Sequence, residues 1–230
     1  MKVVVLAGPE SSGKSWLAAL LQHRFGGTMV GEYVRYFIEQ NPRDTCLADI
    51  PDIARGQLRW EDEARAKQPE LLILDTHLLS NILWSQTLFG DCPPWLEAEL
   101  LKRHYDLHLL LSPDDVEWTA DGQRCQPSLA ERQAFFAASL HWLTDHQQPV
   151  QVITGDWQTR QQHACAAVEL LIDSRETYSA SISQKVRLFT TNYWQASHLK
   201  VSASCLCPLL LHENFVKAFK QRPSARSANL

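Results

Sequence analysis

The sequence predicts an α/β fold in which a five-stranded parallel sheet lies between two layers of helices, with a C-terminal tail. Over residues 1–172, short apolar strand-like runs alternate with longer helix-like stretches. Such alternation indicates parallel strands joined by right-handed crossover helices on both faces of the sheet. The runs at 71–75 and 105–112 are rich in Leu, as is typical of strands covered on both faces. We therefore expect one α/β domain over 1–172 and an appended tail over 173–230.

The expected elements follow in order along the chain. Residues 2–7 are a β-rich apolar run, and the apolar residues of 14–25 recur at helical spacing. The stretch GGTMVGEY then gives a turn and a short second strand. The remaining elements are helix 50–67, strand 71–75, helix 93–104, strand 105–112, helix 128–147, strand 149–154 and helix 157–172.

The composition is that of an ordinary globular protein, with 230 residues of which 45% are apolar and 21% are charged. No apolar run approaches the roughly 20 residues of a membrane span, and the N-terminus lacks the basic region of a signal peptide. We expect a cytoplasmic protein whose cysteines are reduced thiols, because they are scattered and show no convincing zinc-site spacing. These cysteines are Cys46, Cys92, Cys125, Cys165, Cys205 and Cys207.

The formal net charge of −4 is unevenly distributed. From Asp173 onward there are eight Lys/Arg and three Asp/Glu, a local +5, so the first 172 residues carry −9. An acidic body argues against a nucleic-acid-binding enzyme, so we expect a small-molecule partner, no membrane and no nucleic acid. The oligomeric state is left open. We expect the tail to be partly disordered or to hold one short helix, either simply solvated or in contact with an acidic partner.

The stretch GPESSGKS at residues 8–15 matches the pattern G-x-x-x-x-G-K-[ST], between an expected strand and an expected helix. The two glycines allow the backbone to aim N–H groups inward, and the helix N-terminus adds its positive end. The lysine reaches the β- and γ-phosphates, and the last serine offers a hydroxyl to Mg²⁺. The pattern predicts a P-loop NTPase fold that uses ATP and Mg²⁺. The expected nucleotide-binding residues are Gly8, Glu10, Ser11, Ser12, Gly13, Lys14, Ser15 and Trp16.

Asp75 ends the apolar strand LLILD. In a P-loop fold, a carboxylate at this place holds the Mg²⁺ shell, so Ser15 and Asp75 are the expected metal ligands. Asp75 also has the position of an N-cap for the next helix.

The chain has no guanine-reading N-K-x-D stretch, and it is short for a motor with a further helical domain. A small-molecule kinase is therefore favoured. We expect its acceptor site after the second strand, where Glu32 and Arg35 lie one helical turn apart. The carboxylate can bind ribose hydroxyls or take the proton of the attacking one, although a surface ion pair is the alternative. Trp60 and the weaker candidate Tyr33 are expected to stack on the substrate ring, or else to pack in the core.

A kinase also needs cations at the phosphoryl group that is transferred, so we expect a lid over residues 117–133. Arg124 and Arg132 are its candidate arginines, the alternative being solvated side chains. The expected catalytic residues are Lys14, Glu32, Asp75 and Arg124. The tryptophans at positions 84, 95, 118, 142 and 157 are expected in helix packing.

Five ordered stretches resemble the nicotinamide riboside kinase domain of NadR-type proteins. They are GPESSGKS, EYVRYFIE, LLILDTHLLSNILWSQTLFGDCPPWL, YDLHLLLSPDDVEWTADGQR and the W-x-x-R of 157–160. The resemblance covers about residues 1–172. It implies ATP-dependent phosphorylation of the 5′-hydroxyl of nicotinamide riboside to nicotinamide mononucleotide, a step of NAD salvage.

The chain departs from the family in three places. Larger NadR proteins have further domains before the kinase, and we expect none here. His77 stands where the family commonly has a second acid, and Gly31 where relatives have an aromatic residue. Two alternatives stay open: a kinase of another nucleoside, and an ATP-binding switch that acts through a partner. Either Glu32 or Asp75 is the base, and the donor is ATP or GTP.

Overall fold

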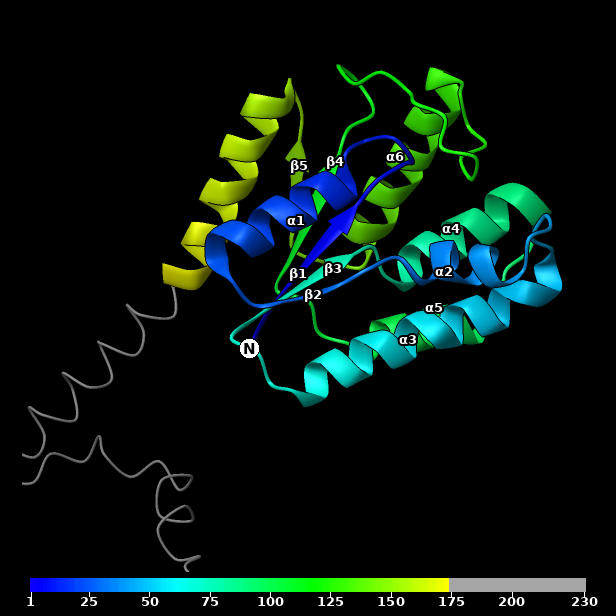
Figure 1. Cartoon of the computed structure of the whole chain (residues 1–230), viewed down its shortest axis with the longest axis horizontal. Helices are drawn as coiled ribbons and strands as arrows, with labels where there is room; N and C mark the ends of the chain where they lie inside the picture. Colours follow the sequence, from blue (N-terminus) through cyan, green and yellow to red (C-terminus); the bar gives the residue numbers. More distant parts are fainter. Residues whose placement is uncertain (174–230) are drawn as a thin grey trace, which may run out of the picture. The chain divides into compact units, whose positions relative to one another are not determined.

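Five parallel strands form the central sheet of the computed structural model, which describes residues 1–173 (Figure 1). Their order across the sheet is β2-β3-β1-β4-β5, with β1 paired to β3 and to β4 in parallel register. The strands are β1 (Lys2–Ala7), β2 (Thr28–Val30), β3 (Leu71–Asp75), β4 (Leu107–Leu111) and β5 (Val150–Ile153). The predicted five-stranded parallel sheet is confirmed.

Helices connect the strands; the α-helices lie where the sequence predicts helices, although α5 is shorter than expected, and the 3-10 turn η1 was not predicted. They are α1 (Lys14–Phe25), α2 (Tyr33–Gln40), the 3-10 turn η1 (Leu47–Asp49), α3 (Ile50–Ala66), α4 (Leu78–Phe89), α5 (Trp95–Leu101) and α6 (Leu129–Asp145). Residues 157–173 form the last helix described.

Side chains of β1 alternate between two buried layers, because successive residues of a strand point to opposite faces. Val3 and Val5 pack with α3, α4, α5 and α6 on one face. Val4 and Leu6 pack with α1 and the last helix on the other. Figure 1 shows these two helical layers with the sheet between them, which is the predicted three-layer sandwich.

The parallel arrangement brings the carboxyl ends of all five strands to one edge of the sheet, where ligands of such folds bind. The loop after β1, the turn before α2, Asp75 at the end of β3 and the segment after β4 all begin at this edge. The fold therefore gathers at one place residues that lie far apart in the sequence.

The predictions for the tail fall on residues 174–230, which lie outside the described residues, and the boundary at 172/173 stays a prediction. Within residues 1–173, no helix is long and apolar enough to cross a membrane. The cysteines of the same range are unpaired thiols, namely Cys46, Cys92, Cys125 and Cys165.

Candidate active site

A cavity of about 390 Å³ opens at the carboxyl edge of the sheet. The loop after β1 lines one side of it from Glu10 to Trp16, and the start of α2 and part of α4 line the other. Residues 116–125, which follow β4, complete the wall. We call these parts the donor half, the acceptor half and the lid segment, the last defined as residues 116–126, which adds Gln126 to the lining stretch.

The donor half depends on two glycines with positive φ. Gly8 has φ +132°, and a Cβ there would lie 2.6 Å from the Leu111 carbonyl oxygen. Gly13 has φ +91°, and its Cβ would lie 2.4 Å from the Trp157 ring. Side chains are excluded at both positions, because the backbone conformation and the close approach leave no room for them.

Hydrogen bonds hold the same loop in a tight curve. The Ser12 hydroxyl donates to the Pro9 carbonyl at 2.8 Å. Lys14 Nζ donates to the Gly8 and Pro9 carbonyls at 3.0 and 2.7 Å. Gly13, Lys14 and Ser15 line the cavity, so the N-terminus of α1 opens into it, which is an arrangement that binds phosphate.

Three charged side chains interact electrostatically beside the phosphate loop: Lys14 and Glu32 line the cavity, and Asp75 lies at the end of β3. Burial lowers the pKa of Lys14, while the nearby Glu32 and Asp75 carboxylates act to raise it. Burial raises the pKa of Glu32, opposed by Lys14 and reinforced by Asp75. Lys14 and Glu32 thus respond to each other and to the Asp75 carboxylate, and the structure brings these three predicted residues within electrostatic range of one another although they follow or end different strands.

Asp75 is 5% exposed, and its Oδ1 has no hydrogen-bond partner within residues 1–173. A buried carboxylate oxygen without a partner is costly unless a ligand satisfies it. Ser15 lines the adjoining cavity. No cluster of three or more His, Cys, Asp or Glu side chains suited to a metal occurs in this part of the chain. The residues therefore fit a Mg²⁺ shared between Ser15, Asp75 and bound phosphates, which need few protein ligands.

The acceptor half begins at Glu32, which precedes the first turn of α2. The Gln57 side chain of α3 fixes this turn, since its Oε1 accepts from the Tyr33 N–H at 2.8 Å and its Nε2 donates to the Gly31 carbonyl at 3.2 Å. Arg35 Nε pairs with Glu32 Oε2 at 3.1 Å. The apolar wall beside this pair consists of Val34, Ile38, Ile50, Ile53, Trp84 and Leu88.

Tyr33 and Trp60 do not line the cavity. Their rings pack edge to face at 4.7 Å, and Tyr36 joins them at 5.5 and 5.7 Å. The Tyr33 ring also lies directly against Gly56. The prediction that Trp60 stacks on the substrate ring is therefore corrected. The Trp60 ring packs in the contact between α2 and α3.

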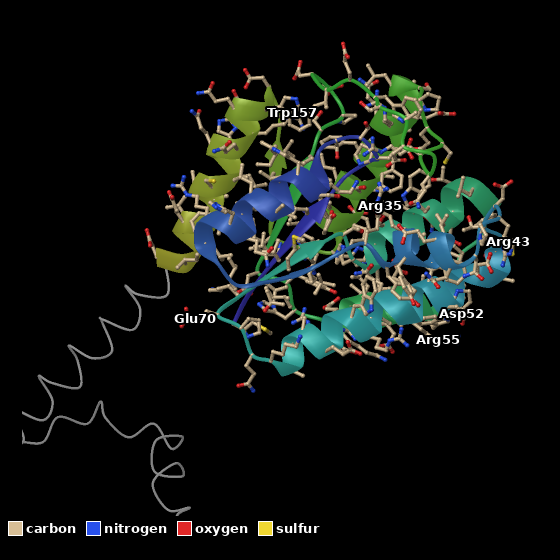
Figure 2. The ribbon with its side chains drawn as sticks, in the orientation of Figure 1. Arg35, Arg43, Asp52, Arg55, Glu70 and Trp157 are labelled. Atoms are coloured by element: carbon tan, nitrogen blue, oxygen red, sulfur yellow. The ribbon has the colours of Figure 1, made fainter. Side chains whose placement is uncertain are left out.

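Two other tryptophans line the cavity, Trp84 and Trp157, and Trp84 also packs against Phe135 of α6 as the sequence predicted. Trp84 lies on the same face of α4 as Ser80 and Asn81, which also line it. Trp157 is 46% exposed and meets Trp16 at 5.1 Å between ring centroids. Figure 2 labels Trp157 at the start of the last helix and Arg35 on α2. The signal that would have found Trp157 is its place directly after β5, at the carboxyl edge of the sheet.

The lid segment is anchored to the donor half by the Glu10 carboxylate, which accepts from Trp118 Nε1 and the Gln126 N–H at 2.7 Å each and from the Cys125 N–H at 3.1 Å. The side chain of Glu10, expected to bind nucleotide, is thus occupied by the lid. Arg124 lines the cavity and donates to the Ser11 hydroxyl at 3.3 Å. Arg132 is not among the lining residues. It is buried in the first turn of α6.

The sequence indicated Arg160 only as part of the W-x-x-R stretch and predicted no role for it. The structure shows that it connects three loops. Its guanidinium is fully buried and donates to the carbonyls of Gly155 at 2.6 Å, Ser112 at 2.9 Å, Asp114 at 2.6 Å and Ser12 at 3.4 Å. It thereby joins the phosphate loop to the ends of β4 and β5.

His77 lies in the core beneath the site and does not line the cavity. Its Nε2 is 3.2 Å from Nε2 of His108, and the exposed fraction of each residue is 1% or less. His108 Nδ1 lies 3.0 Å from the Pro149 carbonyl, which can only accept, so this nitrogen carries the proton. The neutral His108 then accepts from His77. His77, which stands where the family commonly has a second acid, therefore forms a buried pair with His108.

Comparisons with known proteins agree with this geometry. The AAA_28 model, described as an AAA domain, matches residues 3–160. The trifunctional NAD biosynthesis/regulator protein NadR of Salmonella typhimurium is 29% identical over 139 residues, which are 59% of this chain and 34% of that protein. NadR of Escherichia coli is 28% identical over the same length. The chain thus spans about a third of these curated relatives, and the resemblance to NadR-type proteins is confirmed.

Solved structures show the same fold. A crystal structure of NadR protein in complex with NR has a TM-score of 0.64 at 23% identity, covering 73% of this chain and 50% of that one. A thymidylate kinase of Ehrlichia chaffeensis has a TM-score of 0.54 at 13% identity, covering 73% and 98%.

Proposed function

We propose a function for this chain from the premise that it belongs to the AAA_28 family of AAA domains. It transfers the γ-phosphoryl group of ATP to the 5′-hydroxyl of nicotinamide riboside and forms nicotinamide mononucleotide. The curated relatives are named for NAD biosynthesis, and one structural neighbour contains NR, which we take to be nicotinamide riboside.

The observation that carries the proposal is the position of Glu32. Its carboxylate lines the same cavity as Lys14 and Ser15, and it interacts electrostatically with Lys14 and Asp75. A switch that only binds ATP needs no carboxylate opposite its phosphate loop. A kinase needs one to orient the acceptor hydroxyl toward the γ-phosphate and to accept its proton. The raised pKa of Glu32, caused by burial, favours that proton transfer.

The other residues have roles that follow from their positions. The amides at the start of α1 and the Lys14 ammonium bind the β- and γ-phosphates, and Arg124 adds positive charge from the lid segment. Ser15 and Asp75 would hold Mg²⁺. This ion neutralises phosphate charge when bound. Glu32 orients the hydroxyl, and the lid segment excludes water from the cavity.

The charges of the acceptor half favour a nucleoside over a nucleoside monophosphate. The cations that line the cavity in residues 1–173 are Lys14, Arg35 and Arg124. Arg35 is paired with Glu32 at 3.1 Å and with Asp121 at 2.9 Å, which leaves it neutralised. A second phosphate would meet the Glu32 carboxylate, whereas a ribose hydroxyl donates to it. The Trp84 ring and the aliphatic wall fit a flat base, and a cationic nicotinamide ring is attracted to an aromatic face.

The test is ADP release by the purified chain with Mg-ATP and a panel of nucleosides that includes nicotinamide riboside, with Lys14→Ala as the blank. We expect strong stimulation by nicotinamide riboside and none in the blank. Stimulation by a different nucleoside alone would move the assignment to that substrate. ATP binding without stimulation by any nucleoside would contradict the kinase and favour the ATP-binding switch.

A further inference from the structure

The lid segment is tied to the acceptor half as well as to the phosphate loop, and a single carboxylate makes this second connection. Asp121 Oδ2 lies 2.9 Å from Arg35 Nη1 and 3.2 Å from Arg124 Nε. It therefore sits between the arginine that pairs with Glu32 and the arginine that reaches the phosphate loop. Hydrogen bonds that lower the pKa of Asp121, the strongest from Arg35, outweigh the burial that acts to raise it.

The connections form one continuous chain across the cavity. Glu32 pairs with Arg35, Arg35 with Asp121, and Asp121 with Arg124. Arg124 then donates to the Ser11 hydroxyl at 3.3 Å. The side chains of the three middle members are between 23% and 37% exposed, so the pairs are partly shielded from water.

Asp121 also shapes the lid by a separate set of bonds. Its Oδ1 accepts from the N–H groups of Gln123 and Arg124 at 3.1 Å each. One carboxylate oxygen thus folds the local turn, while the other joins the two arginines. This division allows the two roles to be separated by mutation, because an asparagine keeps an oxygen for the turn but loses the charge.

We propose that Asp121 is a positioning residue that holds Arg124 over the phosphate loop and locks the lid segment to the acceptor carboxylate through Arg35. The proposal rests on the proposed function. In this arrangement the acceptor half, through Arg35 and Asp121, positions Arg124 beside the phosphoryl group that is transferred. Occupation of Glu32 by an acceptor hydroxyl is then transmitted to Arg124 through three successive ion pairs.

The test compares Asp121→Asn, which keeps the turn, with Asp121→Ala, which loses both roles. Asp52→Asn is the matched control, because Asp52 forms an exposed ion pair with Arg55 on α3 at 3.2 Å and does not line the cavity (Figure 2). Two quantities are measured: the kcat of acceptor phosphorylation, and the dissociation rate of a fluorescent ATP analogue without acceptor. The thermal midpoint of each variant confirms that it is folded.

For Asp121→Asn we expect a kcat about 10- to 100-fold lower, as for other losses of active-site positioning, and a dissociation rate about tenfold higher. In an Arg124→Ala background the same substitution should change kcat less than about twofold, because the two residues act as a unit. An Asp121→Asn variant with the wild-type dissociation rate overturns the proposal, and so does full additivity with Arg124→Ala. If the wild type shows no acceptor-dependent turnover, the proposed function fails, and the dissociation rates alone still decide the role of Asp121.

Discussion

The donor half and the acceptor half of the cavity are built in different ways. The donor half comes from the continuous stretch 8–15, and its chemistry resides mostly in backbone amides and two glycines. The acceptor half combines side chains from the start of α2, from α3 and from α4. A local motif therefore depends on backbone conformation, whereas the acceptor half depends on how separate elements pack. Mutations in one half should therefore change the binding or the catalytic step of that half and leave the other half unaffected.

Gly13→Ala should have the largest effect on the donor half. The new Cβ at φ +91° would lie 2.4 Å from the Trp157 ring, so the loop must change shape and its amides lose their common direction. We expect ATP affinity to fall more than about 100-fold, on the scale of losing several charge-assisted hydrogen bonds, as measured by titration calorimetry. Gly90→Ala is the matched control, since φ there is +68° but no atom lies within 4 Å of the new Cβ. ATP affinity within threefold of the wild type in Gly13→Ala would refute this account of the loop.

Glu32→Gln should lower kcat and leave ATP binding nearly unchanged, which distinguishes the acceptor half from the donor half. The amide cannot accept the acceptor proton as a carboxylate does, so kcat should fall about 10²- to 10⁴-fold. The dissociation constant of ATP should change less than about threefold, because the donor half is intact. The control is Glu39→Gln, an exposed residue of the same helix. A Glu32→Gln enzyme with nearly normal kcat would show that Asp75, the other carboxylate beside Lys14, takes the proton.

Trp157→Leu should affect only the donor half. The half-exposed ring lies over Gly13 beside Trp16 and lines the cavity, so we expect the base of ATP to stack on it. Stacking on an aromatic side chain contributes about 1–3 kcal/mol per base, so we expect roughly tenfold weaker ATP binding and an unchanged KM for the acceptor. Trp142→Leu, on the opposite helical layer against His146 at 4.1 Å, serves as the control. A raised acceptor KM in Trp157→Leu would place this ring in the acceptor half instead.

The smallest effect concerns the histidine pair beneath both halves. Burial lowers the pKa of His77 well below its ordinary range and the pKa of His108 to about 4. Because the unfolded chain binds these protons more readily, stability is complete above about pH 6.5 and falls as the pH decreases toward 4. The loss is at most about 1.4 kcal/mol per pH unit for each histidine.

Urea unfolding at pH 7.5 and pH 5.5 checks this expectation. His108→Asn should reduce the difference in the free energy of unfolding between the two pH values. His104→Asn should leave it unchanged, because the side chain of His104 is exposed. Equal pH dependence in all three proteins would show that the pair is not the titrating group.

The sequence predicts the donor half well because its information is local. The spacing of Gly8, Gly13 and Lys14 specifies a backbone shape directly, and Asp75 is found from its place at the end of a buried strand. The alternation of elements likewise predicts the sheet and both helical layers.

The acceptor half was predicted less completely, because the burial of a side chain and the direction in which a helix face points depend on tertiary packing. Trp60 and Trp84 are both tryptophans on helices next to strands, yet the first packs against Tyr33 and the second lines the cavity. Helical spacing cannot distinguish them without knowledge of which face meets α2. The Glu10 carboxylate binds the backbone of residues more than 100 positions away, a contact for which the sequence has no signal.

We propose that both halves of the cavity act on one reaction. The most direct test is a crystal structure of the chain with Mg²⁺, a non-hydrolysable ATP analogue and nicotinamide riboside. We expect the 5′-hydroxyl to lie within about 3 Å of the Glu32 carboxylate, a hydrogen-bond distance, and to face the γ-phosphate next to Lys14. A nucleoside bound outside this cavity, or one whose 5′-hydroxyl points away from the γ-phosphate, would contradict the proposal.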